Sequence, residues 1–275
     1  IEQNLPGTLA DVDSEFLHDL RVAVRRTRSG QRQLRRVFPP GPLTRFRDEF
    51  RWLQQVTGPT RDLDVHLLEL DDVPELEPLR ELLTARQALE RRRMQRALRS
   101  ARAGALLADW AAFLDELVAL PAADRPDAGR PIRVVAGERI ATVYRLMVKH
   151  GGAIGDDSPH EALHDLRKSG KELRYLLEFF AGLFPPEVVR PMVRTLKALQ
   201  DSLGRFQDRE VQIALLHSLG GDVAALPDGP AALMTMGRHV DRLQREQDEA
   251  RAEFAARFAA FAAKPQRARV RDTFA

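Results

Sequence analysis

The sequence lacks cysteine altogether, and this absence excludes disulfide bonds, thiolate zinc sites and a cysteine nucleophile. It has no uninterrupted apolar run of about 18 residues, the length at which a helix begins to span a membrane. Its first residues also lack the basic and apolar regions of a secretory signal. With 275 residues, of which 44% are hydrophobic and 30% charged, the chain can bury a substantial core. We therefore expect a cytoplasmic globular protein.

Catalytic motifs are missing as well. The sequence contains no glycine-rich phosphate loop, no serine nucleophile elbow and no pair of carboxylates with catalytic spacing. Aromatic residues are scarce at 6%, with only two Trp and two Tyr, so few side chains could stack on nucleic-acid bases. We expect a protein that is not an enzyme and that has no cofactor.

Lysine is scarce, whereas arginine is abundant and unevenly placed. Of the 43 basic residues only five are Lys, and 40 acidic residues reduce the net charge to +3. Seven Arg and one acidic residue lie between His18 and Arg36, whereas eight acidic residues and one Arg lie between Asp62 and Glu81. A surface that served only solubility would mix the two signs. The segregation therefore indicates a segment that attracts anions.

Long stretches rich in Leu, Ala, Arg and Glu, without period-two alternation, predict an all-α chain. Proline and glycine mark the ends of the predicted helices. We expect breaks at 39–42, 58–59 and 71–74, a fourth helix from 75 to at least 102 and at most 120, a linker at 121–131, and helices at 132–150, 159–182, 187–204, 207–219 and 230–263. The expected organisation is one helical bundle in residues 1–120 and a second in residues 132–275, which together form one domain.

A repeat relates the two halves of the chain. The motif His18-Asp19-Leu20-Arg21 recurs at residues 164–167, an offset of 146. The same offset maps Arg25 onto Lys171, Arg28 onto Arg174, Phe38 onto Phe184, Arg51 onto Lys197, Leu53 onto Leu199, Gly58 onto Gly204, Asp62 onto Asp208 and Val65 onto Val211. A gapless match over about fifty residues predicts a duplicated helical unit whose first three helices are equivalent.

The repeated segment carries cations on one side of a helix. At 100° per residue, five side chains fall within an arc of about 80°, and we call them the first ridge: His18, Arg21, Arg25, Arg28 and Arg32. The equivalent second ridge consists of His164, Arg167, Lys171 and Arg174. Apolar side chains take the other side of each helix, among them Leu17, Leu20, Val24, Leu163, Leu166, Leu173 and Leu177. Like charges at this spacing repel each other, so their recurrence predicts a surface that binds a polyanion.

Other charged residues have less specific roles. Arg51 and Lys197 belong to the second helix of each half and should face the first, while Lys168 and Lys149 are additional candidates for anion binding. Asp62 and Asp208 should cap the third helix or orient an arginine of a ridge. The fourth helix carries arginines all round, which we expect to be mostly solvated: Arg91, Arg92, Arg93, Arg96 and Arg99. Because the ridges lie on the polar side, reversing their charge should leave the melting temperature level or raise it.

The paired motifs resemble those of the conserved histidine α-helical domain, or CHAD, family. The matching segments are His18–Arg28, Leu53–Val65 (LQQVTGPTRDLDV), His164–Tyr175 (HDLRKSGKELRY) and Leu199–Val211 (LQDSLGRFQDREV). The resemblance extends from about residue 8 to residue 263. One departure is that Gln207 and Arg209 occupy the positions of Arg61 and Leu63.

The resemblance implies two antiparallel four-helix bundles related by pseudo-two-fold symmetry. It also implies that both ridges face one central basic surface that binds inorganic polyphosphate, with partners that include CYTH-type domains and with localisation to polyphosphate granules. The sequence contains no Glu-x-Glu-x-Lys motif of a CYTH tunnel domain. The binding residues expected on this basis are His18, Arg21, Arg25, Arg28, Arg32, Arg51, His164, Arg167, Lys168, Lys171, Arg174, Lys197 and Lys149.

Three alternatives compete with polyphosphate. His160–His164 matches the zinc-protease pattern H-E-x-x-H, but a capping box at Ser158–Glu161, the neighbouring cations Arg167 and Lys168 and the lack of a second histidine in the first repeat all oppose a metal site. Nucleic-acid phosphates would be attracted to the same ridges. A helical scaffold could also dock an acidic protein through them.

Overall fold

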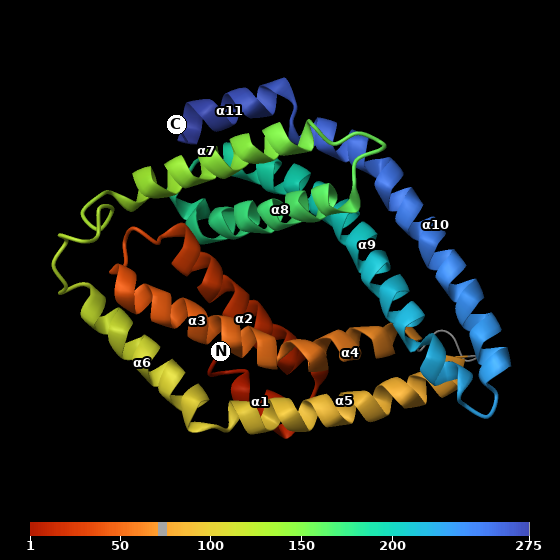
Figure 1. The fold of residues 1–275 in the computed structure, drawn as a ribbon. Helices are drawn as coiled ribbons and strands as arrows, with labels where there is room; N and C mark the ends of the chain where they lie inside the picture. The colour runs from red at the N-terminus through yellow and green to blue at the C-terminus, as the bar shows by residue number, and fades with distance from the viewer. Residues whose placement is uncertain (71–75, 275) are drawn as a thin grey trace. The chain divides into compact units, whose positions relative to one another are not determined.

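The computed structural model describes residues 1–70 and 76–274, and every regular element in these ranges is a helix (Figure 1). The predicted all-α fold is confirmed. None of the helices in these ranges combines the length and the hydropathy that crossing a membrane requires. Contacts group residues 1–129 and 223–232 into one unit and residues 130–222 and 233–275 into a second. The helix break predicted at 71–74 lies outside the described residues.

The core of the first unit is shared by four helices. The unit contains α1 (Leu5–Ala10), α2 (Ser14–Gln33), α3 (Pro40–Val56), α4 (Gly58–Leu70), α5 (Glu77–Leu98) and α6 (Ala101–Leu117). Its core is formed by Leu17, Leu20 and Val24 of α2, Phe46, Phe50 and Leu53 of α3, Met94 and Leu98 of α5, and Leu106 of α6. The apolar side predicted for α2 is therefore the buried side, and it turns the first ridge away from the core.

The second unit is built in a similar way. Its elements are α7 (Ile132–Gly151), α8 (His160–Phe180), the short 3-10 helix η2 (Ala181–Leu183), α9 (Pro186–Ala224), α10 (Gly229–Phe261) and α11 (Lys264–Phe274). Its core includes Ile140 and Tyr144 of α7, Leu166 and Leu173 of α8, Leu199 and Leu203 of α9, Phe254 and Phe261 of α10, and Val270 and Phe274 of α11. The offset of 146 pairs buried positions of the two cores, such as Leu20 with Leu166 and Leu53 with Leu199.

One prediction for the second unit is wrong. Separate helices were expected at 187–204 and 207–219, but α9 is continuous from Pro186 to Ala224. In the first unit Pro59 follows Gly58, and proline has no N–H to continue the helical hydrogen bonds and clashes with the preceding turn. The position equivalent to Pro59 is Arg205, which keeps its N–H, so the second helix continues through Gly204.

The continuous helix also changes the division of the chain. At 1.5 Å per residue, the 39 residues of α9 extend about 58 Å, whereas the 21 residues of α8 extend only about 32 Å. The end of α9 must therefore extend past α8. Residues 223–232 group with the first unit, although a single second bundle was expected over 132–275.

Several helix boundaries differ from the prediction. α3 begins at Pro40 rather than near Leu43, because proline is tolerated in the first turn of a helix. The fourth predicted helix is interrupted at Ser100, whose side chain accepts a hydrogen bond from the backbone N–H of Ala103 and so starts α6. Neither α1 nor α11 was predicted.

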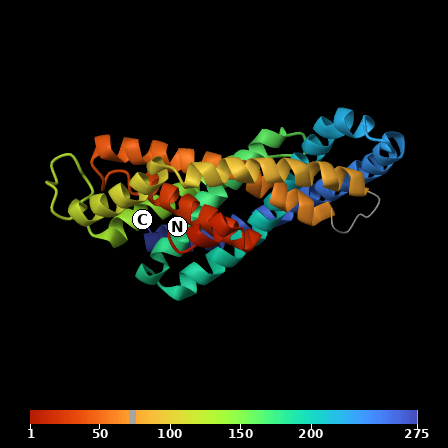
Figure 2. The same cartoon turned by 90° about the horizontal axis from the view of Figure 1, so that it is seen from below.

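The segment between α6 and α7, visible as a looped connection in Figure 2, is mostly exposed, but two of its side chains are buried. Arg125 is buried and donates hydrogen bonds to the carbonyls of Pro121, Leu117 and Leu120. The carboxylate of Asp127 lies 3.2 Å from Nε of Arg36, just beyond the end of α2. Because Arg125 donates hydrogen bonds to three backbone carbonyls, these carbonyls have partners although the segment is not helical.

Candidate anion-binding ridges

The first ridge lies along the side of α2 that is not in the core. The α2 helix starts at Ser14, where the side chain of Asp13 accepts a hydrogen bond from the N–H of Glu15. His18, Arg21, Arg25 and Arg28 are half-buried, whereas Arg32 is exposed. The ridge is therefore not a fully solvated face, because its guanidinium groups lie against the neighbouring helices.

Arg21 is held at the C-terminal end of α3. Its Nη1 donates to the backbone carbonyl of Gln54 at 3.0 Å and to Oγ1 of Thr57 at 3.1 Å. The carbonyls at a helix end have no helical partner, and the break at Gly58 exposes them. Burial lowers the pKa of Arg21, and the charge of Asp62 acts in the opposite direction. Arg21 therefore bonds to the end of α3, so we expect reversal of its charge to lower the melting temperature rather than leave it level or raise it.

Arg28 lies in a group of like charges. Its Nη1 donates to Oε1 of Gln54, a neutral acceptor. Burial lowers the pKa of Arg28, and so do the nearby charges of Arg51, Arg32 and Arg47. These three arginines thus lie close enough to repel Arg28, although Arg51 also pairs with Asp48 at 2.6 Å. The structure brings Arg51 to the first ridge, as predicted.

Three residues near this ridge were missed as candidates. Arg47 precedes Arg51 by four residues and therefore lies on the same side of α3, a spacing that could have identified it. Gln54 is a hydrogen-bond acceptor for both Arg21 and Arg28. Arg61 of α4 has a buried Nη1 without a hydrogen-bond partner among the described residues, as has Nε of Arg25.

The second ridge carries its cations beside carboxylates. Arg167 donates to Asp208 at 2.9 Å, and Nε of Arg174 lies 3.3 Å from Glu178. Arg167, Lys171 and Arg174 are half-buried, as are the equivalent arginines of the first ridge. The guanidinium of Arg174 also lies 5.3 Å from the ring centre of Tyr175. Carboxylates of the second unit therefore neutralise part of the positive charge of the second ridge, whereas Arg28 of the first ridge has a neutral partner.

The remaining predicted residues lie at the margins of the second ridge. Lys168 is exposed and pairs with Asp165 at 3.0 Å. Lys149, near the end of α7, and Lys197, on α9, are both exposed. His164 is half-buried and its Nδ1 contacts Oε1 of Gln207, a residue that replaces an arginine of the first repeat.

Gln200, the equivalent of Gln54, has a different environment. Both atoms of its side-chain amide are buried and have no hydrogen-bond partner among the described residues. A Cβ atom at Gly170 would lie 3.4 Å from Cγ of Gln200, so the glutamine packs against the buried side of α8.

Asp62 and Asp208 were expected either to cap a helix or to orient an arginine of a ridge, and the structure supports the second role. Asp208 orients Arg167, and Asp62 raises the pKa of Arg21. Neither aspartate caps a helix, because Asp62 follows the first turn of α4 and Asp208 lies inside the continuous α9.

The H-E-x-x-H segment has no capping box. α8 starts at His160 with Pro159 as its N-cap, and the hydroxyl of Ser158 instead accepts from the N–H of Gly155. Nδ1 of His160 lies 2.9 Å from Glu210. Within residues 1–70 and 76–274, no three side chains of the metal-binding types gather in one place.

Some arginines of α5 are engaged rather than solvated. Arg91 contacts Asp11, and its Nη2 lies 3.8 Å from Asp64. Arg99 donates to the carbonyl of Leu9 at 3.3 Å. Arg92 and Arg96 are exposed, as predicted.

Comparisons with known proteins agree with the helical architecture. A comparison with curated proteins gives no match. Among solved structures, the CHAD domain from the plant Ricinus communis is 27% identical, with a TM-score of 0.79 over 96% of this chain and 86% of that one. PptA from Streptomyces chartreusis is 17% identical, with a TM-score of 0.65 over 93% of this chain and 98% of that one, and supports the fold alone. The family model of the CHAD domain matches residues 1–217. The chain therefore belongs to the CHAD domain family.

Proposed function

We propose that the chain binds inorganic polyphosphate, without turning it over, through the first and second ridges. The observation that carries this proposal is the gathering of Arg28, Arg32, Arg47 and Arg51 on α2 and α3, where burial lowers the pKa of Arg28 and the three neighbouring arginines lower it further. Such repulsion costs stability, and a polyanion bound to these groups would relieve it. The resemblance to a polyphosphate-binding family supports the same conclusion.

The spacing of the cations suits a long, uniformly charged ligand. From His18 to Arg32 the first ridge extends 14 residues, or about 21 Å along α2. Arginine offers planar, bidentate donors for phosphate oxygens, and polyphosphate presents such oxygens on every unit without bases to be read. We propose that His18 and His164 add donors at the start of each ridge, and that a CYTH-type domain is a partner.

Nucleic acid is the main alternative, and the aromatic residues argue against it. Trp52 packs beneath the guanidinium of Arg102, 4.2 Å from the ring centre, and Trp110 packs against the core phenylalanines. Tyr144 and Tyr175 are buried. The two tyrosines are therefore not available to stack on bases, and Trp52 and Trp110 are half-buried, whereas single-strand binders usually stack bases on aromatic rings. An acidic protein partner is a further alternative that would use the same charges.

A competition experiment separates these ligands. Labelled polyphosphate would be displaced from the intact chain by unlabelled polyphosphate or single-stranded DNA at equal phosphate concentration. We expect polyphosphate to compete more effectively and to be recovered with unchanged chain length. Equal competition by DNA would favour a general phosphate binder, and release of orthophosphate would contradict a non-catalytic role.

A further inference from the structure

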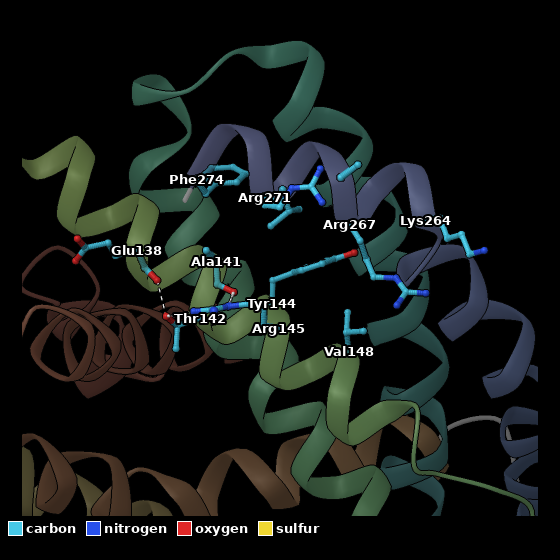
Figure 3. A pocket seen from close by; sticks show the side chains of 12 residues that line it. Glu138, Ala141, Thr142, Tyr144, Arg145, Val148, Lys264, Arg267, Arg271 and Phe274 are labelled. Atoms are coloured by element: carbon cyan, nitrogen blue, oxygen red, sulfur yellow. Dashed lines mark hydrogen bonds between the residues drawn. The ribbon is translucent and has the colours of Figure 1, made fainter.

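The second unit contains a cavity of about 820 Å³ between α7 and α11 (Figure 3). Its lining comes from both helices and consists of Glu138, Ala141, Thr142, Tyr144, Arg145, Val148, Lys264, Arg267, Ala268, Val270, Arg271 and Phe274. The ridge residues of α8 do not line it. Its volume lies within the usual range for sites that bind small organic molecules.

One part of the lining is apolar and fixed. The hydroxyl of Tyr144 donates to the carbonyl of Phe261 at 2.9 Å, which holds the ring in place between α7 and the end of α10. Burial raises the pKa of Tyr144 to about 12, so the phenol stays neutral at physiological pH. Phe274 packs against Phe184, with ring centres 4.6 Å apart. With Val148, these rings form a preformed apolar wall.

The other part of the lining is cationic. Arg145, Lys264, Arg267 and Arg271 contribute four positive charges, against one carboxylate, that of Glu138. Glu138 is paired with Arg130, which does not line the cavity.

The individual cations remain accessible to a ligand. Arg145 makes only long contacts of 3.4 Å within its own helix, and the ion pair of Arg271 with Asp272 is exposed. The guanidinium of Arg267 lies near Tyr144, whose pKa it lowers against the effect of burial. An anionic group at this end of the cavity would therefore meet several donors beside an apolar wall.

We propose that this cavity binds an amphiphilic anion, a single-chain carboxylate of the fatty-acid type or the corresponding alkyl phosphate. The cationic side chains recognise the acidic head, and the wall formed by Tyr144, Val148 and Phe274 accepts the alkyl chain. Polyphosphate has no apolar part and would make no use of this wall. The site is therefore chemically distinct from the two ridges and does not depend on the function proposed for them.

Calorimetric titration of the intact chain with dodecanoate, below the concentration at which it forms micelles, tests this proposal. We expect dodecanoate or dodecyl phosphate to bind with one-to-one stoichiometry, and the tighter of the two identifies the head group. Dodecylamine and tripolyphosphate should not displace either ligand from the cavity. Displacement by dodecylamine would show that the site is hydrophobic and does not select for charge. Displacement by tripolyphosphate would show that the site binds anions without using the apolar wall. Either result overturns the proposal.

Two variants locate the binding. Arg267→Glu should weaken dodecanoate binding about tenfold or more, because it replaces a donor with a repelling charge. Arg238→Glu, an exposed position on α10 outside the cavity, is the matched control and should have no effect. Ala268→Phe fills the cavity and keeps all its charges, so it should abolish binding while the melting temperature shows that the chain is folded. Unchanged binding in both Arg267→Glu and Ala268→Phe would place the ligand elsewhere and contradict the proposal.

Discussion

The guanidinium of Arg21 on α2 donates to the backbone carbonyl of Gln54 on α3, across 3.0 Å. This bond supplies a partner for a carbonyl at the end of a helix that Gly58-Pro59 terminates. Its equivalent in the second unit, Arg167, faces an uninterrupted helix and pairs with Asp208 instead. A single proline therefore accounts for the different roles of two arginines that the sequence repeat makes equivalent.

The first prediction compares these two arginines. Arg21→Ala should reduce the free energy of unfolding by about 1–3 kcal/mol, because the carbonyl of Gln54 and the hydroxyl of Thr57 each lose a charged donor. Arg167→Ala should cost less than about 1 kcal/mol, since Asp208 is 59% exposed and can be solvated. Urea unfolding followed by circular dichroism measures both. Equal losses would show that Arg21 has no special structural role.

The second prediction concerns Gln54, whose side chain holds Arg28 in place. Gln54→Ala should weaken polyphosphate binding several-fold, because Arg28 becomes free to rotate and then loses this conformational freedom on binding. The number of charges is unchanged, so the salt dependence of the affinity should stay the same. The exposed neighbour Gln55 provides the control, and Gln55→Ala should bind as tightly as the unaltered chain. An altered salt dependence in Gln54→Ala would indicate a different kind of defect.

The third prediction concerns pH and Asp64. Burial raises the pKa of this carboxyl above its ordinary value of 3.8, against the opposing effects of its hydrogen bond from Gln87 and the charge of Arg91. The folded state therefore binds the proton more tightly than the unfolded state. Asp64 costs stability at pH 7, and this cost disappears as the pH falls through the raised pKa towards 3.8.

Asp64→Asn makes this cost measurable. The variant should be more stable than the unaltered chain at pH 7, and the difference should shrink as the pH is lowered. Chemical unfolding of both proteins at a series of pH values provides the comparison. A difference that grows towards acid would mean that the folded state favours the charged carboxylate, contrary to the pKa shift.

The all-helical fold and the buried side of α2 could be predicted because both follow from the local pattern of apolar residues. The continuity of α9 is also encoded in the sequence, since Arg205 stands at the position equivalent to Pro59. The similarity of the two repeats nevertheless suggested that the helix would break after Gly204, as it does at Gly58. The bonds from Arg21 and Arg28 to Gln54 could not be predicted, because they depend on how α2 and α3 pack. The cavity beside α11 likewise requires contacts between residues more than 100 positions apart.

The fourth prediction tests the expectation, implied by the family resemblance, that one polyphosphate chain uses both ridges. Replacing Arg167, Lys171 and Arg174 by Gln should weaken long polyphosphate by far more than half, because simultaneous contacts strengthen each other through effective concentration. A short chain that reaches one ridge should lose less. If the variant binds half as many long chains with unchanged affinity, the two ridges are separate sites.

The most direct test of polyphosphate binding by the ridges is the salt dependence of the affinity for long polyphosphate. With about eight cations engaged, a plot of log affinity against log salt concentration should fall with a slope of roughly −5 to −6. Replacing Arg25, Arg28 and Arg32 by Gln should weaken binding and make the slope shallower. Replacing Arg92, Arg93 and Arg96 of α5, which removes the same charge from an exposed surface, should change neither. A slope near zero, or equal losses in the two triple variants, would contradict binding through the ridges.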